Sequence, residues 1–472
     1  MSVPRTVAIV GGGVAGIAAA VRAAESGWRP ILLETRTRLG GRASSFEDVR
    51  TGVELDNCQH VVMGCCTNVL DLYDRLGVLE AVEWQATLCF ARGGGAFDRL
   101  AIAPFLPAPF HYLPSLVRMR LFGLGEKLAI ARAFAAILRM GPKGRIAWQG
   151  RAFSEFLDST RQPLRVVRLF WDQVVTSACN VPSSGCDAAL ALKVFDEGML
   201  AHRFAGAVGV PRVPLGRLYA RVAGIVADAG GELRLRTSAR AIAFDGTRVT
   251  GVVCEDGVVA AQAVIAAVPP DRLARLCSDT LRAHDRRLAD LDLSFSPILG
   301  VHLGLRRRIL EVPNLALPGR ATHWLFAHPA PEASGLAQRL EAVASSSADF
   351  GEAFGGRNEA ELVARVLEDV RWALPDFRDE DLAWARPVLE KRATFTCMPG
   401  VDRRRPGPRV AAGDLRGGVP NLFLAGEWTD VGWPSTMEGA ARSGYAAASA
   451  CTGGSGPCPD LPASALVRLA RA

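Results

Sequence analysis

The sequence predicts an α/β protein in which a discontinuous domain of the Rossmann type is joined to a second domain of mixed α+β structure. Three observations support this fold class. An apolar strand at residues 6–10 runs directly into a glycine-rich turn and a helix-forming stretch. Short alternating strands with a Gly-containing hairpin turn follow between residues 230 and 268. A last apolar strand, residues 421–424, precedes another glycine and a second helix-forming stretch.

The first strand, turn and helix form a motif suited to a pyrophosphate. Gly11 permits the turn, Gly13 lets the backbone approach the phosphates, and Gly16 allows the helix to pack closely on the strand. Ala15 belongs to the same loop, and the phosphates would lie at the positive N-terminus of the helix over residues 17–25. A glycine-rich turn without a ligand is the alternative, but the strand, the spacing and the next acid all favour a dinucleotide.

The second strand, residues 30–33, ends in an acid that is followed by a basic segment. Glu34 is placed to accept hydrogen bonds from the adenosine ribose, and an acid there disfavours the 2′-phosphate of NADP. Arginines able to bind phosphate flank a second glycine pair downstream, and a solvated basic loop is the alternative reading. The candidate cofactor contacts in this segment are Arg36, Gly40, Gly41 and Arg42.

These residues resemble the signature of the large flavoprotein superfamily that includes amine oxidases, protoporphyrinogen oxidases and carotenoid desaturases. The resemblance implies an amine oxidase-like fold with FAD as cofactor, and it implies that Glu34, Arg36 and Arg42 contact FAD. It also implies that the backbone at Ala239 meets the adenine.

The late segment completes the predicted FAD site. Gly426 and Glu427 follow the last strand, and Glu427 could bind the ribityl chain of the flavin. A helix beginning near Ser435 would direct its N-terminal amides toward the flavin ring, with Met437 among the cofactor-binding residues.

A polar segment narrows the resemblance. The cluster Asp56-Asn57-Cys58-Gln59-His60 lies where this superfamily passes its chain over the flavin ring. It resembles the squalene-associated branch, the hydroxysqualene dehydroxylases of hopanoid biosynthesis, over roughly residues 7–450. Two departures are mild: Cys58 stands where the pattern has Gly, and Gly426-Glu427 replaces the usual Gly-Asp. Further segments carry the same resemblance: Leu106-Pro107-Ala108-Pro109, Leu169-Phe170-Trp171, Ala178-Cys179-Asn180, Ala393-Thr394-Phe395 and Trp428-Thr429-Asp430.

The implied reaction removes an allylic hydroxyl while reduced flavin delivers a hydride, so an acid must protonate the leaving oxygen. Asp56 and His60 are the best candidates, because a neighbouring carboxylate would keep a histidine protonated. An equal alternative is that both residues only hold the loop or the flavin. Glu438 is a third candidate, although a carboxylate in the first turn of a helix is often only a dipole partner. Four aromatic residues could line an apolar tunnel or, more commonly, pack in the core: Phe170, Trp171, Trp428 and Trp433.

The domain organisation follows from where the cofactor segments fall. Residues between the first and second cofactor segments are helical and apolar in pattern, as expected of a lobe that binds substrate or faces a membrane. We expect a discontinuous FAD-binding domain (1–75, 206–275 and 406–452), a substrate domain (76–205 and 276–405) and a C-terminal tail (453–472).

Composition indicates an intracellular enzyme. The chain has 472 residues, a formal net charge of +7 and eleven scattered cysteines without a CxxC pair. We therefore expect reduced thiols, no metal site and a cytoplasmic location, and we recognise no signal peptide. Prolines interrupt the uncharged stretch 101–117, which argues against a spanning helix. Residues 116–138 read as a basic amphipathic helix that could lie on the inner face of the cell membrane, or as an ordinary surface helix.

The expected partners are a hydrophobic prenyl-lipid substrate and an external electron donor, and no motif typical of nucleic-acid binding is present. No second glycine-rich nucleotide loop follows another strand, and Gly93-Gly94-Gly95 lacks the strand and the acid of the first loop. Either an external donor or free NAD(P)H that reaches the flavin is therefore implied. Two other functions stay open. One is an oxidative carotenoid or polyprenoid desaturase, or an amine oxidase-like enzyme, with the hydride moving the other way. The other is a flavin-bound prenyl-lipid carrier without turnover.

Overall fold

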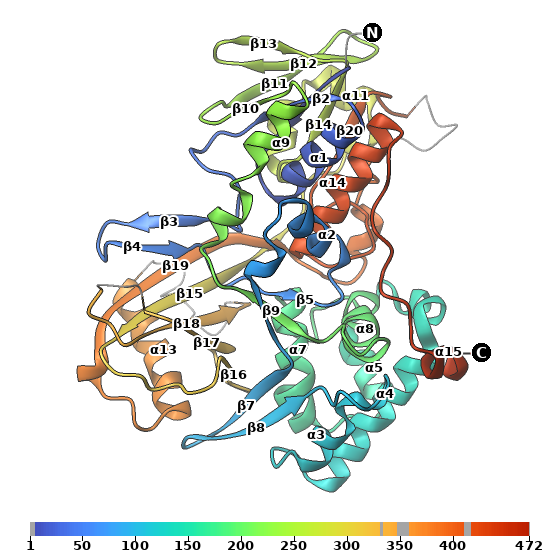
Figure 1. Ribbon diagram of the computed structural model, residues 1–472. Coiled ribbons are helices and arrows are strands. Elements are labelled where there is room, and N and C mark those ends of the chain that lie inside the picture. The colour runs from blue at the N-terminus through green and yellow to red at the C-terminus, as the bar shows by residue number, and fades with distance from the viewer. Residues whose placement is uncertain (1–4, 331–333, 347–357, 410–416, 472) are drawn as a thin grey trace.

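A five-stranded parallel sheet organises one end of the molecule, drawn at the top of Figure 1. The computed structural model describes residues 5–330, 334–346, 358–409 and 417–471, which include every predicted site residue. All neighbouring strands of this sheet run parallel, so their carboxyl ends share one edge. The strand order is β10 (Glu232–Arg234), β2 (Arg29–Leu33), β1 (Thr6–Val10), β14 (Ala263–Ala266) and β20 (Leu422–Leu424).

Helices from opposite ends of the chain cover one face of this sheet. Helix α1 (Val14–Glu25) lies beside α14 (Met437–Thr452) in Figure 1. The two meet backbone to backbone, because a Cβ added at Gly444 would lie only 2.2 Å from the carbonyl oxygen of Ala15. Two further helices pack nearby, α2 (Thr67–Arg75) against α14 and α9 (Val222–Asp228) against α1.

Small antiparallel sheets and short helices flank this core. One is a three-stranded sheet of β11 (Ala239–Phe244), β12 (Val249–Cys254) and β13 (Gly257–Ala260). A hairpin joins β3 (Ser45–Asp48) to β4 (Val53–Asp56), and a third small sheet has the order β5 (Val62–Met63), β9 (Val208–Pro211) and β6 (Val82–Gln85). The short helical segments are α10 (Pro270–Leu276), α11 (Asp279–His284), η1 (Leu79–Ala81), η6 (Leu215–Tyr219), η7 (Arg286–Leu288), η9 (Asp379–Asp381) and η10 (Val401–Arg404).

A seven-stranded mixed sheet forms the lower left of Figure 1. Its order is β19 (Leu382–Phe395), β15 (Phe295–Leu305), β18 (Gln338–Ser345), β17 (Trp324–His328), β16 (Asn314–Ala316), β7 (Thr87–Gly93) and β8 (Ala96–Ala101). Because side chains alternate along a strand, the two faces differ. Leu299, Val301 and Leu303 pack into the apolar core beneath α13 (Glu359–Ala373). Gly300 and His302 therefore lie on the opposite face.

Helices form the remaining lobe, at the lower right of Figure 1. They are α3 (Leu113–Arg118), α4 (Leu124–Arg145), α5 (Phe153–Ser159), α6 (Leu164–Val166), α7 (Asp172–Cys179), α8 (Ala188–Phe195) and α15 (Ala465–Arg471), with the short segments η2 (Phe110–Tyr112), η3 (Ile146–Trp148), η4 (Val167–Trp171) and η5 (Asp196–Leu200). The expectation that residues 76–205 are helical was wrong in part, because β6, β7 and β8 lie there. In the described ranges, no helix has the length and apolar character needed to cross a membrane.

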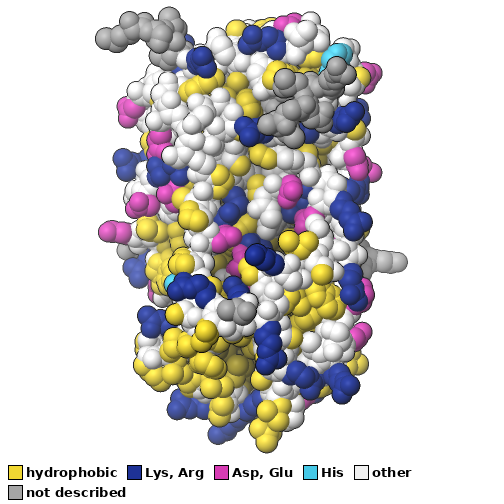
Figure 2. All heavy atoms as spheres, turned by 90° about the vertical axis from the view of Figure 1, so that its right-hand side faces the viewer, with side chains coloured by type: hydrophobic (Ala, Val, Ile, Leu, Met, Phe, Trp, Pro, Cys, Tyr) yellow, Lys and Arg dark blue, Asp and Glu magenta, His cyan; other side chains and the backbone are white. Residues whose placement is uncertain are grey.

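The basic stretch 116–138 is two helices rather than one. Helix α3 ends at Arg118, and the chain turns because the Asp98 carboxylate accepts the backbone N–H groups of Arg120 and Leu121 at 2.8 and 2.6 Å. Helix α4 then begins at Leu124 and is kinked at Gly141. In the lower half of Figure 2, hydrophobic side chains gather on the surface of this part of the molecule and are bordered by Lys and Arg.

Candidate functional site

The candidate cofactor site lies at the carboxyl edge of the five-stranded sheet. Gly11 follows β1, Glu34 follows β2, and Gly426 lies just beyond β20. The Gly11 N–H donates to the carbonyl of Leu33 at 2.8 Å, which fixes the glycine loop beside the end of β2. Crevices outside the carboxyl ends of parallel strands are where α/β sheets bind their ligands.

The glycine loop has room for phosphate at one position and none at the others. Gly11 has a φ of 108°, and a Cβ at Gly16 would lie 1.8 Å from the Gly11 carbonyl oxygen. A Cβ at Gly13 would meet nothing within 4 Å, so open space lies beside the N-cap residue of α1. Ala15 is buried in the first turn of that helix. This arrangement fits a pyrophosphate at the helix N-terminus.

The second glycine pair packs on the first loop. The Gly40 N–H donates to the Gly12 carbonyl at 2.8 Å, and a Cβ at Gly41 would lie 3.1 Å from the Gly13 Cα. Both Gly40 and Gly41 have positive φ, 100° and 62°. Arg36 is exposed and donates to the Gly41 carbonyl at 3.2 Å. The two turns therefore form one continuous backbone cradle.

Glu34 is oriented by backbone amides next to this cradle. Its carboxylate accepts the N–H groups of Gly12 and Arg36 at 2.6 and 2.8 Å. The Thr237 N–H donates to the Glu34 carbonyl at 2.9 Å, which brings β11, beginning at Ala239, alongside. The structure thus gathers Glu34, Arg36 and the start of β11 at one end of the cradle.

An ion pair joins the early and late cofactor segments. Arg42 Nη2 donates to Glu427 Oε1 at 2.6 Å, although the two residues are 385 positions apart. Arg42 Nη1 also donates to the Ala393 carbonyl at 2.8 Å. Gly426 has a φ of 137° and is held by the Ser443 hydroxyl at 2.8 Å. The early and late segments of the predicted FAD site are therefore in contact in the folded chain.

The late helix begins slightly after the predicted position. Thr436 caps α14 by accepting the Gly439 N–H at 3.2 Å, so that partly buried Met437 is its first residue. Glu438 is fully buried and faces α2: it accepts the N–H groups of Asn68 and Val69, both at 3.0 Å. Burial raises the pKa of Glu438. These contacts are those of a helix cap, and they engage Glu438 with α2 rather than with the loop of Asp56 and His60.

We call residues 56–60 the polar loop. Its histidine, His60, differs from the expectation in its charge. Asp56 Oδ1 accepts from the Ser45 hydroxyl at 2.6 Å and from the Leu215 N–H at 3.0 Å. His60 Nδ1 lies 2.7 Å from the Cys58 carbonyl. Burial lowers the pKa of His60, and this exceeds the opposite effect of Asp56. The expectation of a protonated His60 was therefore wrong, because desolvation outweighs the attraction of the nearby carboxylate.

A second polar group, absent from the sequence prediction, faces this loop from the seven-stranded sheet. We call Glu341, His302 and His328 the buried acid cluster. Glu341 Oε2 lies 3.6 Å from His302 Nδ1 and 4.0 Å from His328 Nε2. His302 Nε2 lies 3.0 Å from the Asp56 carbonyl, and His328 Nε2 lies 2.6 Å from Gln59 Oε1. The cluster thus touches both ends of the polar loop.

Burial sets the charge of these groups. It lowers the pKa of His302 to about 4 and that of His328 to about 3. It raises the pKa of Glu341 well above its usual range, an effect that Asp56 reinforces and Arg339 opposes. The available signal was a single acid between the apolar residues Leu340 and Ala342 of β18. Sequence could not show that this acid faces a loop of residues 56–60.

An apolar wall adjoins the buried acid cluster. Cys58, Phe326 and Val343 form a small buried hydrophobic group, packed against partly buried Ile298 and Trp324. The four aromatic residues considered for a tunnel do not belong to this wall. They are buried in other apolar clusters: Phe170, Trp171, Trp428 and Trp433. Apart from Cys58 of the polar loop, this wall is therefore built from strand residues that the sequence did not single out.

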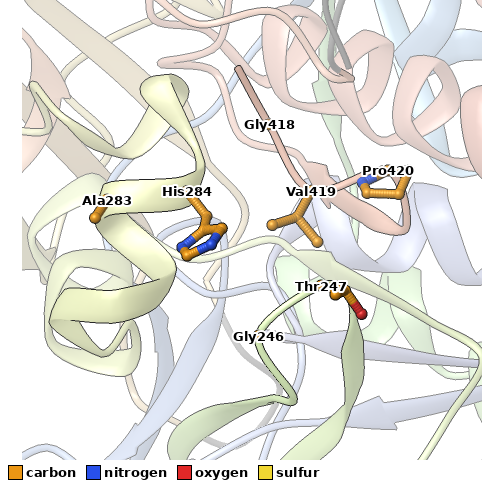
Figure 3. A pocket seen from close by; sticks show the side chains of 7 residues that line it. All are labelled: Gly246, Thr247, Ala283, His284, Gly418, Val419 and Pro420. Carbon is orange, nitrogen blue, oxygen red and sulfur yellow. The ribbon is translucent and has the colours of Figure 1, made fainter. Parts of the chain in front are cut away.

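A separate cavity of about 580 Å³ opens at the other edge of the five-stranded sheet (Figure 3). Its lining includes residues just before β12 and β20, so it lies at strand amino ends. Among the described residues that line it, His284 is the one titratable side chain, and its Nδ1 lies 2.8 Å from the Thr280 carbonyl. This cavity is distinct from the glycine loops.

Comparison with known proteins agrees with this geometry. A family described as flavin containing amine oxidoreductase matches residues 14–452. A hydroxysqualene dehydroxylase of Sinorhizobium fredii is 27% identical over 469 residues, covering 94% of this chain and 98% of that protein. A zeta-carotene desaturase of Synechocystis is 25% identical over 489 residues, covering 94% and 96%. The structure of an oxidoreductase from Methanosarcina mazei superposes with a TM-score of 0.68 at 15% identity, covering 93% and 98%. The predicted fold class and the predicted FAD cofactor are confirmed.

Proposed function

Because this chain belongs to the flavin containing amine oxidoreductase family, we propose that it removes the allylic hydroxyl of hydroxysqualene reductively and yields squalene. The observation that carries the proposal is the polar loop facing the buried acid cluster beside an apolar wall. Dehydroxylation requires a proton for the departing oxygen within a site that accepts a hydrocarbon chain. The similarity to hydroxysqualene dehydroxylases supports the same reaction.

FAD supplies a hydride to the substrate carbon when it is bound in the reduced state. The residues proposed to hold it are those of the cradle, with Glu34 at the ribose and Arg42 and Glu427 at the junction of the two segments. The chain's own contribution is to orient the cofactor, to exclude water with the apolar wall and to hold a proton near the polar loop.

The reductant is proposed to be an external donor of the NAD(P)H class. Gly93, Gly94 and Gly95 form the turn between β7 and β8, and the Gly94 N–H donates to the Trp372 carbonyl at 3.0 Å. A Cβ at Gly93 would lie 3.0 Å from the Trp372 ring. This turn is packed against α13 and leaves no glycine loop for a second nucleotide there.

The decisive test is the direction of hydride transfer. Chemically reduced enzyme is mixed anaerobically with hydroxysqualene, and flavin absorbance and squalene are followed. Reoxidation with release of squalene is expected. A flavin that stays reduced would contradict the proposal. The similarity to zeta-carotene desaturases favours a second candidate, desaturation, which predicts instead that oxidised enzyme becomes reduced by a carotene. A carrier without turnover would do neither.

We propose that the lipid substrate is taken up from an anionic bilayer surface at α3 and α4. No acidic residue lies between Asp98 and Glu126, whereas Arg118, Arg120 and Arg132 are exposed. Six large hydrophobic side chains in the same stretch are 50–76% exposed: Phe105, Phe110, Leu113, Val117, Leu124 and Leu128. Basic residues around an apolar patch, visible in Figure 2, are typical of binding to anionic lipid.

This surface is tested by sedimentation with vesicles of phosphatidylglycerol and of phosphatidylcholine. Wild type is expected to bind the anionic vesicles and to be released by salt. The double variant Leu124→Ser, Leu128→Ser should lose most of this binding. Val49→Ser, which alters a side chain 93% exposed on the β3–β4 hairpin, is the matched control and should bind like wild type. Equal binding of the double variant would contradict this surface.

A further inference from the structure

The buried acid cluster contains a carboxylate oxygen without a partner. Glu341 is 2% exposed, and its Oε1 has no hydrogen-bond partner among the described residues. Burying a polar atom without a partner costs free energy, so such groups point to a functional role. This oxygen lies beside Gly300, where an added Cβ would be 3.5 Å from Oε1 and 3.3 Å from Cys58 Sγ. A side chain at residue 300 would contact both Oε1 and Cys58, so the glycine allows the acid to lie directly against the polar loop.

The other oxygen of Glu341 shows where the proton of the cluster resides. His302 Nε2 lies 3.0 Å from the Asp56 carbonyl, and because a carbonyl only accepts, this nitrogen carries the ring proton. In the neutral ring, Nδ1 is then an acceptor, and it lies 3.6 Å from Glu341 Oε2. Two acceptors face each other in a dry site unless one of them carries a proton. His302, with a pKa lowered to about 4, does not.

Every charged or titratable neighbour of Glu341 can be assigned to an element. They are His302 on β15, His328 on β17, Arg339 on β18, and Asp56 and Cys58 in the polar loop. Both histidines are neutral near pH 7, since burial lowers their pKa values. The guanidinium of Arg339 and the backbone N–H of Gln59 favour an ionised Glu341, but burial and Asp56 act more strongly in the opposite direction and raise its pKa. The balance of these groups keeps the proton on Glu341.

We propose that Glu341 is the proton donor of the site, held as a carboxylic acid by His302 and passing its proton to the oxygen of the departing allylic hydroxyl. This inference rests on the proposed dehydroxylation. The proton forms an O–H bond as the allylic C–O bond breaks with its electron pair on oxygen, so that water leaves. The carbon receives the hydride that the cofactor supplies. Glu341 is left as a carboxylate and takes a proton from solvent, and the external NAD(P)H-class donor restores the two electrons.

The first test measures the proton itself and needs no substrate. Infrared spectra of the FAD-loaded enzyme at pH 7 are compared between wild type, Glu341→Gln and Glu368→Gln. Glu368 lies on α13, beneath the other face of the sheet, and pairs with Arg365 at the surface. We expect a C=O band of an un-ionised carboxylic acid that is lost in Glu341→Gln and kept in Glu368→Gln. Identical carboxylic acid bands in all three would overturn the inference.

The second test measures the role of the proton. In the anaerobic reoxidation with hydroxysqualene, Glu341→Gln should slow the reaction at least about hundredfold, the usual contribution of a general acid. It should also remove the decline in rate at high pH that accompanies ionisation of Glu341, whereas Glu341→Asp should restore part of the rate. A Glu341→Gln enzyme with wild-type rate and pH profile would refute the role.

Failure of the inference and failure of the proposed function give different results. If wild type converts hydroxysqualene but Glu341→Gln is equally fast, the function stands and the inference falls. If wild type leaves hydroxysqualene unchanged, the function falls, and with it the role of Glu341 in hydroxyl departure. The infrared band then decides whether the cluster stores a proton.

Discussion

The carboxyl edge of the five-stranded sheet and the polar face of the seven-stranded sheet are assembled from different interactions. Backbone contacts between glycines hold the first, as in the bond from the Gly40 N–H to the Gly12 carbonyl. Buried titratable side chains hold the second, where Glu341 lies between His302 and His328. The first region should therefore be sensitive to added volume. The second should respond to pH, because its stability depends on which groups carry protons.

The largest effect is expected where volume is added to the carboxyl edge. Gly16→Val places a Cβ 1.8 Å from the Gly11 carbonyl oxygen, closer than atoms can approach. The loop between β1 and α1 must then move, at an expected cost of more than about 3 kcal/mol in the free energy of unfolding. We expect little soluble protein and no bound FAD, measured by thermal unfolding and by flavin release.

Gly13→Ala separates volume from cofactor binding in the same loop. A Cβ at this position meets nothing within 4 Å of the protein, so the melting temperature without FAD should be unchanged. FAD content should nevertheless fall, because the methyl group would occupy the space proposed for the pyrophosphate. Full FAD occupancy in Gly13→Ala would show that the phosphates lie elsewhere.

The polar face of the seven-stranded sheet should weaken in acid. The pKa of His302 is lowered to about 4, so the unfolded chain binds a proton below about pH 6.5 that the folded state does not take up. Stability from this group is present above pH 6.5 and is lost as the pH falls. Between pH 7 and pH 5, the free energy of unfolding should therefore decrease by about 2 kcal/mol less in His302→Gln than in wild type.

Urea denaturation at the two pH values measures this difference. The control is His284→Gln at the distant cavity of Figure 3, an exposed histidine whose Nδ1 lies 2.8 Å from the Thr280 carbonyl of its own helix. It should behave like wild type at both pH values. An identical acid response in His302→Gln would mean that His302 is protonated in the folded state.

A smaller effect is expected for a substitution of Glu438. It tests whether this residue caps α2 or takes part in catalysis. Glu438→Gln can keep one oxygen for the N–H groups of Asn68 and Val69, but it places an amide NH₂ where Oε1 accepts from Asn68 Nδ2 and Arg442 Nη2, at an expected cost of about 2 kcal/mol. The melting temperature should fall while the rate per bound FAD stays constant, since the carboxylate faces α2. A normal melting temperature with slow turnover would instead return Glu438 to the list of catalytic candidates.

The elements at the carboxyl edge of the five-stranded sheet could be predicted from the spacing of residues that are close in sequence. The strand at residues 6–10, the acid at Glu34 and the helix of α14 all lie close to their predicted positions, because each is encoded by adjacent residues. The break between α3 and α4 was not predictable in the same way. It depends on Asp98, which is distant from Arg120 in sequence and reaches it only through the folded chain.

The polar face of the seven-stranded sheet could not be predicted from local spacing either, because its residues are distant in the sequence. His302 and Glu341 meet because β15 and β18 pair in a register that opposes these two residues. Sequence alone does not show which strand pairs with β15. The charge of His60 was mispredicted because a neighbouring acid is visible in the sequence, whereas the burial that outweighs it is not.

The smallest effect is expected at the ion pair that joins the two cofactor segments. Arg42→Ala removes the bonds to Glu427 and to the Ala393 carbonyl, while both glycine turns keep their backbone contacts. The fold should persist. The Kd for FAD should rise about tenfold, equivalent to about 1.4 kcal/mol. Titration of the apoprotein with FAD, followed by flavin fluorescence, measures this change.

The pair can be isolated from the charge of Arg42 by a double-mutant cycle with Glu427→Gln. Arg240→Ala, which breaks an exposed pair with Glu255 on the three-stranded sheet, is the control and should leave the Kd unchanged. If Arg42 and Glu427 act together, the double variant should bind FAD no more weakly than the weaker single variant. Strict additivity would mean that the early and late segments bind FAD independently, and the carboxyl edge would then depend on its glycine turns alone.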